Sequence, residues 1–342
     1  MTDVRVVHLV CSTGFAGVER YMVNVAIGLV RADVSVVVIG GDDSQMRSAF
    51  AGTDVEWLPG HDMRSALASL RTSPVPDILH THMSQADLVG WWYRRGTGRR
   101  SRHVSTRHFA GRRGGSAVAR ALFRPIGQSL AAQIAISHFV AQNVEPPAEV
   151  VYSGVESTDA VTPRGRFVLA AQRLEPEKKT ADVIEAWARS SGPRDGWRLR
   201  IAGDGSERDA LEGLARSRQV AESVDFLGHR TDVPDLLASA ALVVAPTPRE
   251  GLGILVLEAM AHGTPVVAAG GGGHLETVGI AAPGLLFAPG DTAAAARIID
   301  ELLADPLLRK SSGDALRGLQ QERFTIEAQV AGTRAVYERL FT

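Results

Sequence analysis

Two glutamates separated by seven residues, Glu250 and Glu258, are the first candidates for chemistry in this sequence. An apolar strand is expected at 242–245, and a glycine-containing turn follows it. Helical periodicity then begins near Gly253 and continues to Ala261. A strand, a turn and a helix in this order place the first helical turn at the carboxyl end of a strand, where α/β folds bind ligands.

The first turn of this helix is suited to hold a phosphate group. The N–H groups of Gly253, Ile254 and Leu255 would lack intrahelical partners, and such groups bind anions. Glu258 lies about five residues in, roughly 7.5 Å along the axis, where a carboxylate reaches beyond the phosphate to the vicinal hydroxyls of a ribose. Glu250 precedes the helix, on the side where a donor sugar would lie. The competing interpretation of Glu258 is compensation of the helix dipole.

This segment resembles the retaining glycosyltransferase family 4, which has the two-domain GT-B fold. Glu250 and Glu258 match the E-x7-E signature of the family, and the run EAMAHGTPVV that starts at Glu258 matches its EAMA-x-G-x-PVV pattern. The resemblance implies that Gly251 and Leu252 also line the donor site. It covers nearly the whole chain, is strongest over 167–286, and is looser in the first half, where the family binds its acceptor.

A second segment, QRLEPEKK at 172–179, contains two cations five residues apart, Arg173 and Lys178. Placed across a strand-to-helix turn, they can meet a leaving diphosphate from two sides; the alternative is an exposed pair on a loop. The segment resembles the family's GRL-x-PEKG turn, in which the matching cations bind the diphosphate. Gln172 and Lys179 replace family glycines, and the adjacent lysines leave open which one reaches the phosphate.

Three further segments of the second half resemble family elements around the donor. AGDG, which includes Gly203, resembles a turn at a strand end, although a plain tight turn is equally expected from its spacing. FLGHR resembles the FLG-x-V segment, which implies that Gly228 and backbone groups near Arg230 hold the nucleotide base. GGGHLE at 271–276 resembles a segment that shapes the pocket wall.

In the first half, GFAGVER at 14–20 resembles the family's GG-x-ER loop, and Gly17 would let the backbone approach the donor phosphate. The run DILHTH ends a predicted strand with His80 and His82. His108 follows the next strand, at the position of the family histidine beside the donor sugar. We predict that His108 contacts the sugar and that His82 is a candidate acceptor contact, whereas His80 is structural.

Ten arginines and no acidic residue lie between Leu88 and Val144. Arg112 and Arg113 lie in a glycine-rich loop after His108, and a planar guanidinium suits a carboxylate or a phosphate. We predict that this pair recognises an anionic group on the acceptor, or an anionic membrane surface; the alternative is a solvated basic surface from arginine-rich coding. Aromatic residues are not interleaved as nucleic-acid stacking needs, so no nucleic acid is expected.

The sequence has no D-x-D motif, which holds a divalent cation in the other major glycosyltransferase fold. We therefore expect no metal and no other cofactor, and the charge of the diphosphate would be met by Arg173, Lys178 and the helix N-terminus. Cys11 is the only cysteine, which excludes a disulfide scaffold and a cysteine-clustered metal site.

Composition and patterning predict the architecture. The 342 residues are 45% hydrophobic and 22% charged, with a net charge of −1, which is typical of globular chains. Continuous apolar strands alternate with helices, which indicates parallel sheets covered on both faces. The expected strands are 4–10, 34–39, 55–58, 78–82, 103–106, 133–136 and 149–152, then 167–171, 197–202, 224–227, 242–245 and 265–268.

The pattern restarts after a polar connection at 153–165, so we predict an α/β GT-B fold of two Rossmann-like, doubly wound parallel-sheet domains that face a central cleft. Residues 1–155 would form the acceptor-binding domain, and 156–324 the donor-binding domain. The resemblance implies that the C-terminal helix, within 325–342, packs back on the first domain.

The expected function is transfer of a sugar from a nucleoside-diphosphate sugar, with UDP preferred and GDP second, to an acceptor with retention at the anomeric carbon. Two alternatives remain: a nucleotide-sugar epimerase of the same fold, and a non-catalytic nucleotide-sugar-binding subunit. A Rossmann oxidoreductase lacks its G-x-G-x-x-G fingerprint. No apolar run approaches 18 residues, so we expect a cytoplasmic protein for which peripheral membrane contact is optional.

Overall fold

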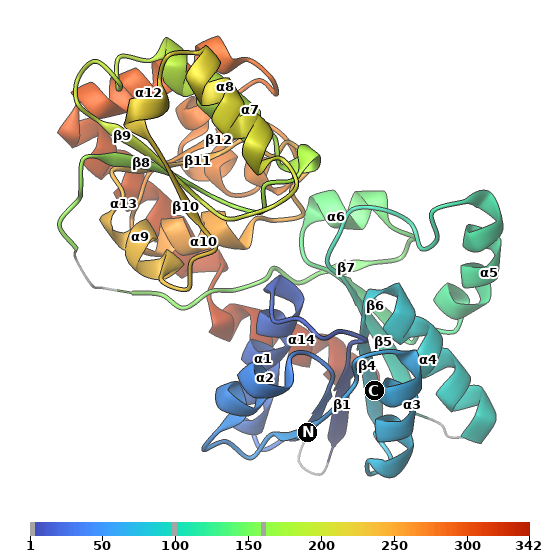
Figure 1. Cartoon of the computed structure of the whole chain (residues 1–342). Helices are drawn as coiled ribbons and strands as arrows, with labels where there is room; N and C mark the ends of the chain where they lie inside the picture. The colour runs from blue at the N-terminus through green and yellow to red at the C-terminus, as the bar shows by residue number, and fades with distance from the viewer. Residues whose placement is uncertain (1–3, 98–100, 159–161) are drawn as a thin grey trace. The chain divides into compact units, whose positions relative to one another are not determined.

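The computed structural model describes residues 4–97, 101–158 and 162–342, and the chain divides into two compact units (Figure 1). Unit 1 consists of Met1–Gly154 together with Ile326–Thr342, and unit 2 consists of Val155–Thr325. The last helix of the chain therefore belongs to the unit formed by the first half of the sequence.

Unit 1 is built on a parallel sheet of β-branched and other apolar segments. Its described strands are β1 (Arg5–Leu9), β2 (Ser35–Ile39), β3 (Glu56–Leu58), β4 (Ile78–His82), β5 (Arg102–Arg107), β6 (Ala132–Ala135) and β7 (Glu149–Val150). They are ordered β3-β2-β1-β4-β5-β6-β7. The order reverses between β1 and β4, and such a switch point opens a crevice at the carboxyl ends of the strands.

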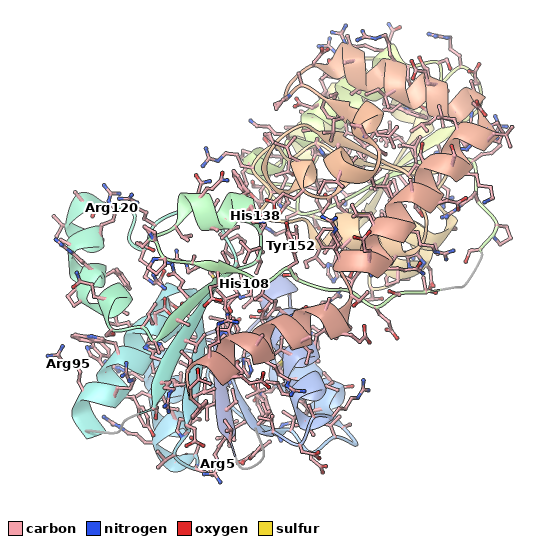
Figure 2. The ribbon with its side chains drawn as sticks, turned by 180° about the vertical axis from the view of Figure 1, so that it is seen from behind. Arg5, Arg95, His108, Arg120, His138 and Tyr152 are labelled. Carbon is pink, nitrogen blue, oxygen red and sulfur yellow. The ribbon has the colours of Figure 1, made fainter. Side chains whose placement is uncertain are left out.

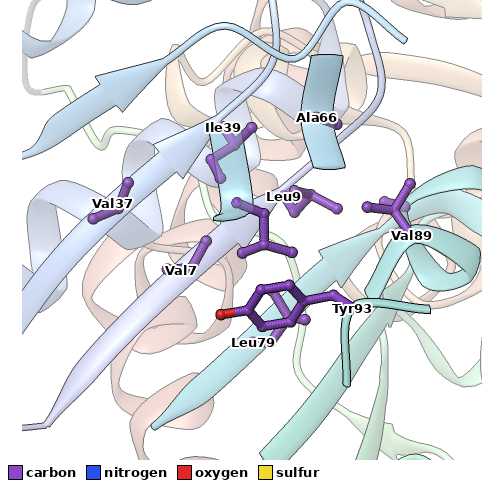
Figure 3. Packing of buried hydrophobic residues seen from close by; sticks show 10 residues of the cluster. Val7, Leu9, Val37, Ile39, Ala66, Leu79, Val89 and Tyr93 are labelled. Atoms are coloured by element: carbon purple, nitrogen blue, oxygen red, sulfur yellow. The ribbon is translucent and has the colours of Figure 1, made fainter. Parts of the chain in front are cut away.

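The two faces of this sheet have different chemistry. One face carries Val7, Leu9, Val37, Ile39 and Leu79, which pack against α3 (Met63–Thr72) and α4 (Met83–Thr97) in an apolar core (Figure 3). Alternate residues point to the opposite face, because side chains alternate along a strand. That opposite face is covered by α1 (Gly17–Val30) and α14 (Ile326–Arg339), and it contains several histidines.

Helix α14 is held in unit 1 by close packing and hydrogen bonds. Gly28 of α1 leaves room for Val330, which the side chain of any other residue would meet. The Gln329 Oε1 atom accepts a hydrogen bond of 2.6 Å from the Gly154 N–H. The other described helices of unit 1 are α2 (Asp43–Phe50), α5 (Ala117–Gln128) and α6 (His138–Asn143).

Unit 2 repeats the parallel doubly wound design. The strand order is β10-β9-β8-β11-β12-β13. These strands are β8 (Phe167–Ala171), β9 (Arg198–Ala202), β10 (Val224–Gly228), β11 (Leu242–Ala245), β12 (Val266–Ala269) and β13 (Leu286–Phe287). The described helices are α7 (Thr180–Arg189), α8 (Arg208–Ser217), α9 (Val233–Ser239), α10 (Ile254–Ala261), α11 (Val278–Ala281), α12 (Thr292–Ala304) and α13 (Pro306–Arg323).

Candidate active site

The turn between β11 and α10 presents a helix N-terminus that no side chain caps within the described chain. Gly253 is the N-cap residue, and its φ of 91° is a left-handed conformation that favours glycine. The helix proper begins at Ile254, so the N–H groups of Ile254 and Leu255 lie in its first turn. Such a terminus can hold an anion. Glu258 is the fifth residue of α10 and is partly buried.

The glycine-rich segment that contains Gly272 and Gly273 packs against the backbone of this turn. The Gly273 N–H donates to the Glu250 carbonyl at 2.9 Å. A Cβ atom at Gly272 would lie 2.5 Å from the same carbonyl oxygen, so only glycine allows this close approach. The segment therefore holds the backbone of Glu250 in place.

Lys178 and Glu250 form an ion pair at the end of two neighbouring strands. The Lys178 Nζ atom lies 2.7 Å from Glu250 Oε2, and the side chains are 20% and 25% exposed. Lys178 ends a single 3₁₀ turn, Pro176–Lys178, that follows β8. The adjacent Lys179 side chain is exposed and makes no ion pair within the described part of the chain. The arrangement thus distinguishes two lysines that the sequence could not.

Gln172 fixes the turn that carries Lys178. Its Nε2 atom donates to the Lys178 carbonyl at 3.0 Å and to Thr180 Oγ1 at 2.9 Å. The Thr247 hydroxyl, after β11, lies 3.3 Å from both Gln172 Oε1 and the Lys178 carbonyl. In the sequence, Gln172 is visible only as a departure from a family glycine. Its amide instead links the two strand ends that supply Lys178 and Glu250.

Lys179, the second departure from glycine, adopts a left-handed conformation with φ 56° and ψ 35°. This conformation costs roughly 1–2 kcal/mol for a residue with a side chain, whereas glycine adopts it without strain. Part of this gain is offset, because glycine has more conformational freedom to lose from the unfolded chain. We expect Lys179→Gly to stabilise the protein by about 0.5–1 kcal/mol. Urea unfolding of both proteins measures this difference. Lys310→Gly, at the fifth residue of α13, is a control that should destabilise by a similar amount. Equal stability of Lys179→Gly and the parent would mean that the turn relaxes around the lysine.

Arg173 lies apart from this pair in the structure. It is 67% exposed and pairs with Glu177 at 3.0 Å. An exposed pair of this kind contributes little, so the guanidinium can exchange Glu177 for a ligand at small cost.

The remaining predicted donor residues have defined local roles. The Gly203 N–H donates to the Gly228 carbonyl at 2.8 Å, and a side chain at Gly203 would clash with the Gln172 carbonyl. Arg230 pairs with Asp232 at 2.6 Å on the surface. In unit 1, Gly17 begins α1, where Glu19 Oε2 accepts the Ala16 N–H at 2.8 Å.

His108, which is labelled in Figure 2, follows β5. It lines a cavity of about 220 Å³ together with Thr106, Phe109 and Arg112. It is 7% exposed. Burial, followed by the charge of Arg107, lowers the pKa of His108 to about 3, so the imidazole is neutral at pH 7. A neutral imidazole can donate one hydrogen bond and accept another.

His82 does not reach this cavity, which corrects its prediction as an acceptor contact. It is fully buried, and both ring nitrogens already have partners. Nε2 lies 3.0 Å from His8 Nδ1, and Nδ1 lies 3.1 Å from His108 Nε2. His80 is also buried, with its nitrogens 2.5 Å from the Tyr337 hydroxyl and 2.6 Å from Thr106 Oγ1.

Arg113 is likewise not a free cation, and the predicted arginine pair must be corrected. Its side chain is 1% exposed, with Nε 2.6 Å from Asp87 Oδ2 and Nη1 3.1 Å from Glu145 Oε2. Hydrogen bonds to Gln133 and Ser105 complete its coordination. Removing one partner of a buried pair costs about 3–5 kcal/mol, so Arg113 is part of the framework of unit 1.

Arg112 is exposed, and with two exposed arginines of α5, Arg124 and Arg120, it borders a second cavity of about 620 Å³. Arg120 is labelled in Figure 2. Phe123 adds an apolar wall. Arg99 and Arg100 lie outside the described residues. The basic character predicted from the sequence is therefore present at this cavity, without Arg113 as a free cation.

Among the described helices, none has the length and apolarity that a bilayer span requires.

Two family models match the chain. One, described as "Glycosyltransferase Family 4", matches residues 15–158, and the other, described as "Glycosyl transferases group 1", matches residues 159–317. Two doubly wound parallel sheets with this topology define the GT-B class of glycosyltransferases, which confirms the predicted fold. The chain belongs to glycosyltransferase family 4.

The sequence relatives match this chain over only part of their own length. The chain is 34% identical over 172 residues to a glycogen synthase of Mycobacterium tuberculosis and 31% identical over 172 residues to N-acetyl-alpha-D-glucosaminyl L-malate synthase of Bacillus anthracis. These matches cover 50% of this chain, and 42% and 45% of those proteins. The chain thus matches less than half the length of either relative.

Solved structures match over the whole chain at low identity. The structure of Anabaena Alr3699/HepE in complex with UDP and glucose has a TM-score of 0.80 and 21% identity, covering 98% of this chain and 100% of that chain. Sucrose-phosphate synthase from Thermosynechococcus elongatus has a TM-score of 0.78 and 20% identity, covering 98% of each. At these identities the likeness shows the fold.

Proposed function

We propose that this protein transfers a sugar from a nucleoside-diphosphate sugar to an acceptor with retention of configuration. The observation that carries the proposal is the Lys178–Glu250 pair beside the N-terminus of α10. A cation next to an uncapped helix start suits a diphosphate, and a carboxylate next to both suits the hydroxyls of the attached sugar. We propose UDP as the nucleotide of the donor, with GDP as the second choice, and the structures of Alr3699/HepE in complex with UDP and with UDP-glucose support this proposal.

The proposed reaction breaks the bond between the anomeric carbon and the diphosphate oxygen. The acceptor oxygen forms its bond to the same face of that carbon, and the acceptor proton moves to the departing phosphate oxygen. Lys178, Arg173 and the first turn of α10 stabilise the charge that develops on the diphosphate. Glu250 orients the sugar, and we propose His108 as a second contact to it. No oxidant or reductant is involved.

We also propose that the reaction needs no metal and that the acceptor carries an anionic group. The lack of a D-x-D motif supports the first proposal. The exposed guanidiniums of Arg112, Arg120 and Arg124 at one cavity support the second, since arginine binds carboxylates and phosphates through its planar fork.

The function is tested with UDP-, GDP-, ADP- and dTDP-sugars, first by thermal shift and then by turnover with and without EDTA. We expect a nucleotide at 100 times its dissociation constant to add roughly 2.7 kcal/mol of stability, and donor hydrolysis to continue in EDTA. Isomerised donor without added acceptor would indicate an epimerase. Binding without hydrolysis or transfer would indicate a binding subunit, and activity lost in EDTA but restored by Mn²⁺ would refute metal independence.

Glu258 is expected to bind the ribose of the donor. Glu258→Ala should weaken UDP binding by roughly 1.5–3 kcal/mol for each charge-assisted hydrogen bond that is lost, less any compensation by water. Calorimetric titration with UDP and with 2′-deoxy-UDP separates the two interpretations, because the deoxy analogue should lose less affinity on mutation. Equal losses for the two ligands would mean that Glu258 serves the helix dipole.

A further inference from the structure

Four histidines lie together on the sheet face that α1 and α14 cover. His8 of β1 is paired in register with His80 of β4, and His82 lies two residues further along the same strand. His82 is in turn paired with Thr106 of β5, and His108 follows two residues later. Because side chains two residues apart point to the same face, the register of three strands brings these imidazoles into contact.

Three of these histidines form a hydrogen-bonded chain that leads to the cavity at His108. His8 Nδ1 lies 3.0 Å from His82 Nε2, and His82 Nδ1 lies 3.1 Å from His108 Nε2. At the inner end, His8 Nε2 has no hydrogen-bond partner among the described residues. At the outer end, Nδ1 of His108 is the ring nitrogen that the chain leaves for a ligand.

The three imidazoles of this histidine chain are neutral near pH 7. Burial lowers the pKa of His8 to about 3, and burial followed by the charges of neighbouring histidines lowers the pKa of His82 well below its usual value. Arg107 is the charged group that acts on His108. Tyr21 of α1 meets the rings of His82 and His108 edge-on. No carboxylate in the described chain hydrogen-bonds to these imidazoles, so none can draw a second proton onto them.

The hydrogen bonds of this neutral histidine chain can point in only two directions, because each imidazole carries one N–H. If His108 donates inward, its Nδ1 is an acceptor and His8 Nε2 becomes a buried N–H without a partner. If His8 donates outward, His8 Nε2 is only an unused lone pair, and His108 carries its proton on Nδ1. Buried donors without partners are rarer than buried acceptors without partners, so the outward direction is favoured.

We propose that His8 and His82 are positioning residues that hold His108 as the Nδ1–H tautomer and so make it a hydrogen-bond donor to the bound sugar. This inference rests on the proposed function, in which His108 contacts the sugar. A donor at this position binds a hydroxyl oxygen of the substrate, and an acceptor would bind the hydroxyl proton. The histidine chain therefore selects which polar atom of the sugar His108 recognises.

A metal site formed by His8, His80 and His82 is the competing explanation for this cluster, since their ligand atoms lie within 4.8 Å of one another. Both nitrogens of His80 already bond to hydroxyl groups, and both nitrogens of His82 bond to imidazoles. Only His8 has a free lone pair. A cation would have to break the hydrogen bonds that explain the arrangement.

The tautomer is measured directly by long-range ¹H–¹⁵N correlation spectra of the full chain labelled with ¹⁵N-histidine at pH 7.5. We expect His108 to be protonated on Nδ1 in the unliganded protein. His82→Leu removes the donor to His108 Nε2 and should shift His108 toward the other tautomer, whereas His82→Asn retains an N–H donor and should keep the original one. His103→Leu is the matched control: His103 is equally buried, but it lies on the opposite sheet face and bonds to Thr81.

Donor hydrolysis provides the second measurement. We expect His82→Leu to lower kcat about tenfold with donor KM within twofold, His82→Asn to recover most of that loss, and His103→Leu to stay within twofold of the parent. An Nε2–H tautomer of His108 in the parent protein would overturn the proposal, as would a His82→Leu spectrum with His108 unchanged. Loss of these hydrogen bonds on adding Zn²⁺ would favour the metal site. If His108→Ala leaves turnover unchanged, the sugar contact fails while the spectra still decide the tautomer.

Discussion

Replacing Lys178 with alanine is expected to lower kcat/KM for the donor by about a hundredfold or more, because a preorganised group aimed at developing charge contributes roughly 10²–10³ to the rate. The same substitution at Lys179 should change it less than threefold. The difference follows from position: Lys178 Nζ lies 2.7 Å from Glu250, and its backbone is fixed by Gln172, whereas the Lys179 side chain is exposed.

Steady-state kinetics on the two variants, with UDP affinity measured alongside, checks this prediction. Lys179→Ala is the matched control because it removes the same charge one residue away. Thermal unfolding shows whether loss of the Lys178–Glu250 pair disturbs the fold. A large loss in Lys179→Ala with little change in Lys178→Ala would reassign the diphosphate contact.

Much of the fold follows from the sequence because buried parallel strands are continuous apolar runs bounded by turns. Three strands, β4, β8 and β11, have the predicted limits, and most others differ by one or two residues. Helix α13, which has 18 residues, was not predicted, although Asp305 and Pro306 form a helix start. The Asp305 carboxylate accepts the N–H groups of Leu307 and Leu308, and the proline occupies the first turn.

The candidate site was less predictable, because its details depend on contacts between distant segments. The sequence identified Lys178 and Glu250 but could not show that they touch across 72 positions. Arg113 was misassigned because its partners lie just outside the acid-free stretch: Asp87 precedes that stretch, and Glu145 follows it. Spacing alone cannot show that both ends of the stretch fold back onto its middle.

The histidine chain depends on strand register in the same way. Alternation along β4 predicts that His80 and His82 share a face. It does not predict that β1 lies beside β4 and brings His8 into line, since β1 and β4 are separated in the sequence by two other strands. The H-x-H spacing was therefore visible, but its partner was not.

Acid is expected to unfold unit 1 at a pH well above the usual range of acid denaturation. Five of its histidines, His8, His80, His82, His103 and His108, are buried, and in each case burial is the main cause of a lowered pKa. In the unfolded chain each returns to about 6.5. Between these values the unfolded state binds more protons than the folded state, so stability falls as the pH falls below about 6.5.

The size of this effect is set by the number of histidines. Each contributes a loss of about 1.4 kcal/mol per pH unit, which amounts to roughly 2 kcal/mol each and 10 kcal/mol together at pH 5. A domain of ordinary stability has about 5–15 kcal/mol in total. Unit 1 should therefore lose its fold cooperatively near pH 5.

Hydrogen exchange followed by mass spectrometry at pH 7.5, 6.5, 5.5 and 5.0 resolves the two units, provided that exchange times are corrected for the intrinsic rate at each pH. Unit 2 is the internal control, because only His262 and His274 among its described residues have a lowered histidine pKa. Peptides of β1, β4 and β5 should lose protection at a higher pH than those of β8, β9 and β11. Equal protection of both units down to pH 5 would mean that water reaches the buried imidazoles and lets them titrate within the folded sheet.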